Sequence, residues 1–118
     1  MTTAAEMVAK ARSKIREVTP QDVSRELGEV LIVDVREAEE YAAGHIPGAV
    51  NIPRGVLEFK IDQFPALHDR NREIVLQCQG GGRSALATVA LQELGFKNVS
   101  NLAGGFGAWS AAGLPTER

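Results

Sequence analysis

Residues 73–94, EIVLQCQGGGRSALATVALQEL, give the clearest indication of how this chain folds. The first part, Glu73 to Gln77, has an apolar and β-branched centre and is predicted to be a buried strand. The last part, Ser84 to Leu94, repeats apolar side chains at helical spacing. A cysteine, three glycines and an arginine lie between these parts. A strand that leads through so short a loop into a helix is typical of a parallel α/β sheet.

The remainder of the chain repeats this alternation of strands and helices. The predicted strands span 30–35, 49–52 and 98–102. The predicted helices span 19–27, 37–43 and 106–112, with one or two helical turns over 56–67. We therefore expect an α/β domain with a mostly parallel central sheet flanked by helices.

The N-terminal segment is predicted to be an amphipathic helix from about Thr3 to Glu17. Met7, Val8 and Ala11 recur at helical spacing, and basic residues cover the other side. We expect this helix to pack on the domain or at a contact between two copies of the chain. Its basic face leaves a membrane-surface role as the alternative, although its apolar stripe is narrow. The expected division is a helical extension over 1–15 and one domain over 16–118.

The composition sets limits on the partners and the compartment. The chain has 118 residues, a net charge of −2 and one cysteine. This charge gives no reason to expect nucleic acid or an anionic membrane as a partner, and no run approaches the ~20 apolar residues that span a bilayer. The N-terminus does not resemble a secretory signal, and a single cysteine cannot form an internal disulfide. These features predict a soluble cytoplasmic domain, and the sequence leaves monomer and homodimer as open alternatives.

Cys78 is the candidate nucleophile. In an open parallel sheet, ligands bind beyond the carboxyl ends of the strands, which is where the sequence places this cysteine. The glycine loop can turn successive N–H groups inward, and Arg83 adds a positive charge. Such a loop would lower the pKa of a thiol that is otherwise only about 3% ionised at pH 7. The alternative is that Cys78 is a small buried apolar residue with no chemical role.

The sequence resembles the rhodanese homology domain over residues 16–116. Three segments carry the resemblance: Asp34-Val-Arg36 with Tyr41-Ala-Ala-Gly-His-Ile-Pro-Gly-Ala49, the loop Cys78–Arg83 with Ser84, and Gly104-Gly-Phe-Gly-Ala-Trp109. The resemblance implies a parallel α/β fold and a catalytic cysteine, Cys78, that cycles through a persulfide. It also implies a sulfur-binding loop made of Gln79, Gly80, Gly81, Gly82, Arg83 and Ser84.

Loop length distinguishes a sulfurtransferase from a protein phosphatase. Protein phosphatases use a Cys-x5-Arg loop that surrounds a phosphate, whereas this chain has Cys78-x4-Arg83, with Ser84 at the position of the phosphatase arginine. The smaller loop favours a single sulfur atom over a phosphoryl group. Phosphatase or arsenate reductase activity is therefore the less favoured interpretation.

Other polar and aromatic residues of these segments are expected to be structural. Asp34 and Arg36 should form a charge-assisted network that ties their turn to neighbouring loops. His45 should be a hydrogen-bonded turn residue, because no second ligand lies at metal-binding spacing. His68 is expected to be exposed and without a role.

Two residues have two alternative placements each. Phe106, like Trp109, should pack the last helix onto the sheet, or else Phe106 forms a wall of the cysteine pocket. Arg54 is either a solvated surface residue or faces the mouth of that pocket.

The predicted activity is sulfur transfer in two steps, from thiosulfate or a persulfide donor to cyanide, a thiol or a protein acceptor. Covalent catalysis of this kind needs an activated nucleophile and stabilised charge, with no metal and no organic cofactor. The alternative is a sulfur-carrier or regulatory module of the same fold with little turnover.

Overall fold

Five parallel strands form the central sheet of the computed structural model, which describes residues 1–118. The strands are β1 (Arg16–Val18), β2 (Leu31–Asp34), β3 (Val50–Asn51), β4 (Ile74–Gln77) and β5 (Val99–Leu102). Their order across the sheet is β1-β5-β4-β2-β3, and every neighbouring pair is parallel. The predicted α/β fold with a parallel sheet is thereby confirmed.

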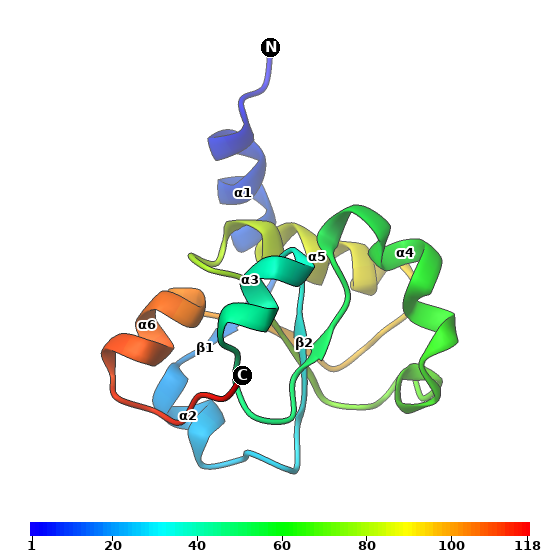
Figure 1. Cartoon of the computed structure of the whole chain (residues 1–118). Coiled ribbons are helices and arrows are strands. Elements are labelled where there is room, and N and C mark those ends of the chain that lie inside the picture. Colours follow the sequence, from blue (N-terminus) through cyan, green and yellow to red (C-terminus); the bar gives the residue numbers. More distant parts are fainter.

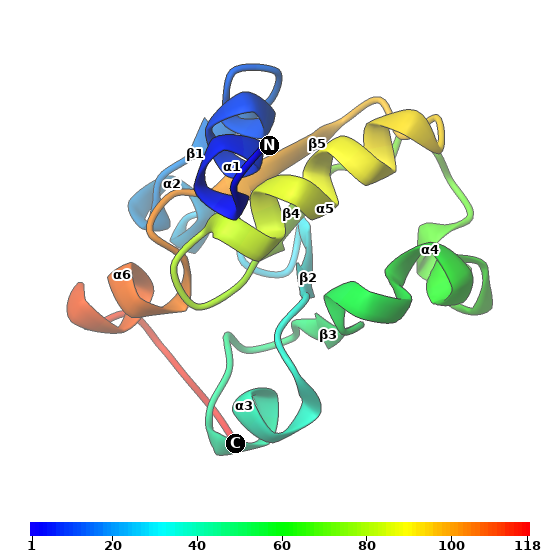
Figure 2. The ribbon, with the colours of Figure 1, turned by 90° about the horizontal axis from the view of Figure 1, so that it is seen from above.

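Helices cover both faces of this sheet (Figures 1 and 2). They are α1 (Ala4–Arg12), α2 (Pro20–Ser24), α3 (Ala38–Ala43), α4 (Leu57–Lys60), α5 (Gly82–Glu93) and α6 (Gly105–Ala111). Three short 3-10 turns, η1 (Arg54–Val56), η2 (Ile61–Gln63) and η3 (Pro65–Leu67), flank α4. None of the helices has the length and the apolar character that crossing a membrane requires.

Two hydrophobic cores result, one on each face. Val33 and Leu76 are paired in register on β2 and β4 and belong to the core beneath α4 and α5. Ile32 and Val75, one position earlier on the same strands, belong to the core that contains Trp109 of α6. This alternation explains why the first three residues of both central strands are apolar, since side chains on each face are buried.

The N-terminal segment differs from the prediction of one helix over 3–17. α1 begins with a capping box between Thr3 and Glu6 and ends at Arg12, and Arg16–Val18 then pairs with β5 as an edge strand. Pairing with β5 supplies backbone hydrogen bonds that a longer helix would have made within itself. α1 packs beside α5, as expected of a helix that covers the domain (Figure 2).

α5 begins earlier than predicted, and this brings the helix to the cysteine. Its first residue is Gly82 rather than Ser84, and Gly81 precedes it with a left-handed φ of 101° that glycine adopts without strain. Two residues of the predicted loop therefore lie in the first turn of the helix. The carboxyl ends of β2 and β4 lie side by side at the edge of the sheet that this turn covers.

Candidate active site

Cys78 lies between the end of β4 and the start of α5, in the loop that the sequence predicted. It is 1% exposed and is the only cysteine. The N–H groups of Gly81 and Ser84 donate to its Sγ at 3.1 and 3.4 Å, and the Ser84 Oγ lies 3.3 Å from the same atom. A ring of polar groups from the loop and the first helical turn thus surrounds one sulfur atom.

The pKa of Cys78 results from opposing effects. Burial raises it, because a thiolate loses hydration in a protein interior. Contacts with Ser84 and with the N–H groups of Gly81 and Gly80 lower it and outweigh burial, so that the pKa of Cys78 lies below its ordinary value. The surroundings of the sulfur therefore favour the nucleophilic form of the thiol.

The N-terminus of α6 holds the outer side of the loop. Phe106 N–H donates to the Cys78 carbonyl at 2.8 Å, and Gly107 N–H donates to the Gln79 carbonyl at 3.0 Å. With these carbonyls turned toward α6, the following N–H groups point the other way, into the loop.

Gly105 makes this approach possible. It has φ of 60°, and a Cβ there would lie 2.3 Å from the Cys78 carbonyl oxygen. Sequence reasoning gave roles only to Phe106 and Trp109 of the Gly104–Trp109 segment and missed that of Gly105. A pair of adjacent glycines just before a helix was the available signal.

A series of hydrogen-bonded polar side chains connects the Cys78 sulfur to β5 and β1. Ser84 Oγ lies 2.6 Å from Oδ1 of Asn101 on β5, and both residues are fully buried. Asn101 Nδ2 donates to Oε2 of Glu17 at 3.0 Å and to the Gly81 carbonyl at 3.1 Å. Sequence reasoning identified neither Asn101 nor Glu17, because only the sheet order brings β1 and β5 beside this loop.

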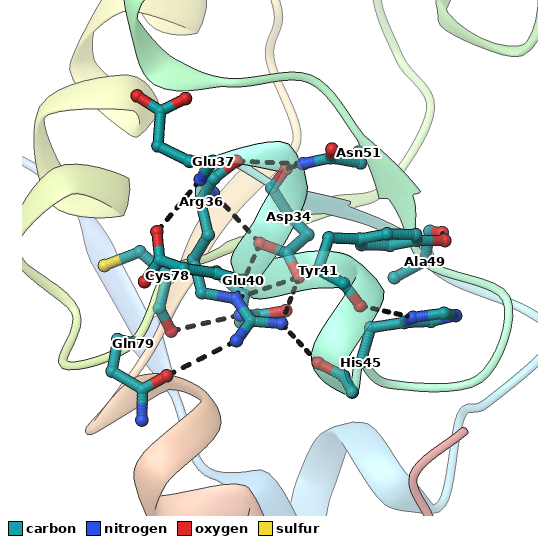
Figure 3. A network of polar contacts seen from close by, with 12 residues as sticks. Asp34, Arg36, Glu37, Glu40, Tyr41, His45, Ala49, Asn51, Cys78 and Gln79 are labelled. Atoms are coloured by element: carbon teal, nitrogen blue, oxygen red, sulfur yellow. Dashed lines mark hydrogen bonds and ion pairs between the residues drawn. The ribbon is translucent and has the colours of Figure 1, made fainter. Parts of the chain in front are cut away.

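Asp34 and Arg36 form the predicted charge-assisted network, and the prediction is confirmed. Arg36 Nη2 donates to Asp34 Oδ2 at 2.8 Å and to the Gly44 carbonyl at 2.7 Å, and the side chains of Arg36 and Asp34 are 3% and 0% exposed. Arg36 Nη1 donates to Oε1 of Gln79 at 3.3 Å, so the network reaches the residue next to Cys78 (Figure 3).

Arg83 has a carboxylate partner, which the sequence analysis did not foresee. Its guanidinium donates to both carboxylate oxygens of Glu40 on α3, at 2.8 and 3.1 Å. The hydrogen bond from Arg83 lowers the pKa of Glu40 to about 2, against a smaller opposing effect of burial. The positive charge expected at the loop is therefore largely balanced by Glu40.

A hollow of about 330 Å³ opens beside the loop. Its lining includes Gln79, Arg36, Glu40 and Phe106, and the Arg36 guanidinium stacks 4.4 Å from the centre of the Phe106 ring. Phe106 therefore forms a wall next to the cysteine loop. Arg54 does not line this hollow; it pairs with Glu58 at 2.9 Å and borders a groove beside α1 and α5, which bears out its placement on the surface.

The remaining signature residues are structural, as predicted. His45 Nδ1 lies 2.9 Å from the Tyr41 carbonyl, and its ring stacks on Tyr41. Trp109 is fully buried, and its Nε1–H donates to the Pro115 carbonyl at 2.7 Å. His68 is exposed. Nowhere do three or more His, Cys, Asp or Glu side chains come together in a way that could hold a metal ion.

Comparison with known proteins agrees with this geometry. The Rhodanese-like domain matches residues 19–112. The chain belongs to the rhodanese family. A "Sulfurtransferase" from Allochromatium vinosum is 34% identical to this rhodanese over 104 residues, which are 86% of this chain and 94% of the relative. "Thiosulfate sulfurtransferase 16, chloroplastic" from Arabidopsis thaliana is 38% identical over 93 residues, which are 72% of this chain and 78% of the relative. These relatives support a transferase of the rhodanese family.

A solved structure from Rhodopseudomonas palustris is similar to this rhodanese over 99% of the chain and 96% of its own length, with a TM-score of 0.91 and 37% identity. That protein is of unknown function and carries the name "Possible Tyrosine Phosphatase". The similarity extends through α1 and β1, which lie outside the residues matched to the Rhodanese-like domain.

Proposed function

We propose that this rhodanese transfers a sulfane sulfur, which it carries as a persulfide on Cys78. The observation that carries the proposal is the position of the Cys78 Sγ, at the end of β4 with loop N–H donors directed at it. Such donors stabilise a thiolate in the resting enzyme and would stabilise the charge on a bound sulfur during transfer.

The first step loads the sulfur. The Cys78 thiolate attacks the outer sulfur of thiosulfate, or of a persulfide donor. The Sγ–S bond forms as the S–S bond of the donor breaks, and sulfite, or the donor thiolate, leaves with the electron pair. The main-chain N–H groups of the loop, from Gln79 to Arg83, and of Ser84 hold the charged sulfur. No metal or organic cofactor is needed, because the electrons balance within the exchange.

The second step delivers the sulfur. A nucleophilic acceptor, which is cyanide in an assay and a thiol or a protein in the cell, attacks the outer sulfur of the persulfide. The Sγ–S bond breaks, and the Cys78 thiolate is restored. A lone cysteine that must stay reduced between cycles suits the cytoplasm, where we place the enzyme.

The geometry of the loop favours sulfur over phosphate. Ser84 stands where a phosphatase loop has its arginine, and its hydroxyl lies 3.3 Å from Sγ in the buried interior. Arg83 is paired with Glu40. Neither residue is arranged to surround a phosphoryl group, which needs several donors around three oxygens.

The intact mass of the protein before and after exposure to thiosulfate, with Cys78→Ser as control, tests the proposal. We expect the wild type to gain the mass of one sulfur, to lose it on addition of cyanide, and the variant to gain none. A folded wild type with a free thiol and no gain would eliminate thiosulfate as the donor. Loading by a protein persulfide alone would then point to the sulfur-carrier alternative.

A further inference from the structure

The orientation of the Asn101 amide is determined by its neighbours. Its two N–H groups point at Oε2 of Glu17 and at the Gly81 carbonyl oxygen, at 3.0 and 3.1 Å. Both neighbours are acceptors only at neutral pH. A reversed amide would set its carbonyl oxygen against a carboxylate and a second carbonyl, so Oδ1 must face Ser84.

The Ser84 hydroxyl has two neighbours to which it could donate its proton. It has one proton, and its Oγ lies 2.6 Å from Asn101 Oδ1 and 3.3 Å from the Cys78 Sγ. The shorter distance is that of a good O–H···O hydrogen bond, and Ser84 is the donor available to Oδ1. The proton therefore lies toward Asn101, and Ser84 presents a lone pair to the sulfur.

We propose that Asn101 is a positioning residue that makes the Ser84 hydroxyl an acceptor, rather than a donor, toward Cys78. In this arrangement the hydroxyl favours the thiol, whose S–H it can accept, and the main-chain N–H groups of Gly80, Gly81 and Ser84 favour the thiolate. The inference rests on the proposed function for its relevance to catalysis, since it concerns the nucleophile of that reaction.

The amide also connects the nucleophile to the N-terminal part of the chain. Glu17, on β1, precedes the residues matched to the Rhodanese-like domain. Its carboxylate lies 3.9 Å from Nε of Arg12, at the end of α1. The orientation of the buried Ser84 hydroxyl thus depends on β1, an edge strand that lies outside the residues matched to the Rhodanese-like domain.

Charged groups near the loop come in opposed pairs. These are Arg12 with Glu17 from α1 and β1, Arg36 with Asp34 at the end of β2, and Arg83 with Glu40 from α5 and α3. Because Asn101 and Ser84 are uncharged, variants at these two positions leave those pairs in place. A change in thiol ionisation can then be assigned to the direction of the hydroxyl.

The sign of the Ser84→Ala effect is the first test. Alkylation of the single cysteine by iodoacetamide, measured across pH, reports its pKa directly. If the hydroxyl accepts from the thiol, Ser84→Ala leaves the pKa of Cys78 unchanged or lower. If the hydroxyl donates to the thiolate, Ser84→Ala raises that pKa, and this result would overturn the proposal. Ser100→Ala is the matched control, because Ser100 is also fully buried and its hydroxyl has no hydrogen-bond partner.

Removal of the acceptor is the second test. Asn101→Leu keeps the approximate size of the side chain but frees the Ser84 proton to turn toward the sulfur. We expect alkylation below the thiol pKa to become roughly threefold to tenfold faster, the effect of one hydrogen bond gained by the thiolate. The gain should vanish in the double variant with Ser84→Ala. An equal gain in both backgrounds, or none in either, would refute the role of the hydroxyl.

These measurements are independent of sulfur transfer. Alkylation needs no thiosulfate, so a failure of the mass experiment would eliminate thiosulfate as the donor and leave this inference standing. The converse result, sulfur loading with a raised pKa in Ser84→Ala, would refute only the inference. Circular dichroism spectra of each variant establish that it is folded, and Ser84→Ala still decides the sign if Asn101→Leu does not fold.

Discussion

The ends of β2 and β4 are neighbours in the sheet, but they are completed in different ways. After β2, the side chains of Asp34 and Arg36 form a fully buried ion pair that also reaches Gly44 and Gln79. After β4, the backbone itself curls around the Cys78 sulfur and offers its N–H groups. The first end is held by side chains, and the second is built from main chain.

This difference suits the end of β2 to a structural role and the end of β4 to binding a charged sulfur. In the buried ion pair each charge has its partner within the protein, so the pair serves mainly to hold the structure. Main-chain N–H groups directed at a sulfur can stabilise a negative charge on it, without a side chain that must move. The β2 end therefore supports the β4 end, and substitutions in the two regions should have different consequences.

Arg36→Met should have the largest effect, and it should be on stability. The variant leaves Asp34 charged and buried without its partner, which costs about 3–5 kcal/mol of unfolding free energy. Chemical denaturation measures this loss. The control is Arg25→Met, which breaks an exposed pair with Asp22 and should cost less than about 1 kcal/mol. Equal losses for both variants would contradict the structural role of the buried pair.

Gly105→Ala should affect the sulfur loop more than the fold. The new Cβ would lie 2.3 Å from the Cys78 carbonyl oxygen, so the loop or α6 must move. A displacement of that size can reduce the rate of sulfur loading by about 100-fold.

Gly113→Ala is the matched control for this substitution. Gly113 has a similar φ of 72°, and no atom lies within 4 Å of the position that a Cβ would take, so only backbone strain of about 1–2 kcal/mol applies. Single-turnover loading with thiosulfate, followed by mass, distinguishes the two variants. Similar loading rates would show that α6 does not shape the loop.

Glu40→Gln should have a small effect on stability and should change the reaction rate more with some sulfur donors than with others. The Arg83–Glu40 pair is partly exposed, so its loss should cost less than about 1 kcal/mol. The freed guanidinium would attract a dianionic donor, and we expect kcat/KM for thiosulfate to rise roughly threefold at low salt and less at high salt. A persulfide donor with one negative charge should gain less than thiosulfate, and salt-independent rates would contradict the electrostatic cause.

The Arg83–Glu40 pair should also make the free energy of unfolding depend slightly on pH below neutrality. The pKa of Glu40 is lowered from 4.5 to about 2 in the folded protein, so its contribution is complete above pH 4.5. That contribution is lost as the pH falls from about 4.5 toward 2. The stability difference between the wild type and Glu40→Gln, measured by denaturation at several pH values, should shrink over this window. A difference that stays constant down to pH 2 would show that the pair does not hold in solution.

The layout of the domain and the position of Cys78, between a strand and the following helix, could be predicted from the sequence alone. Apolar runs such as Ile74–Leu76 predicted buried strands, and the glycine loop after Cys78 predicted a turn into a helix. These features depend on neighbours along the chain, where side-chain period and glycine freedom are local properties. The pairing of Asp34 with Arg36 could also be predicted, because the two residues are separated by a single position.

The surroundings of the loop, in contrast, follow from tertiary packing. Arg16 and Glu17 were predicted as the end of a helix but lie in a strand, because β5 offers an open edge to β1. Asn101, Glu40 and Gly105 meet the Cys78 loop from three different elements. No spacing in the sequence relates them to the cysteine. Contacts between distant segments follow from the order of strands and the packing of helices, and these depend on the burial of the whole chain rather than on any local pattern.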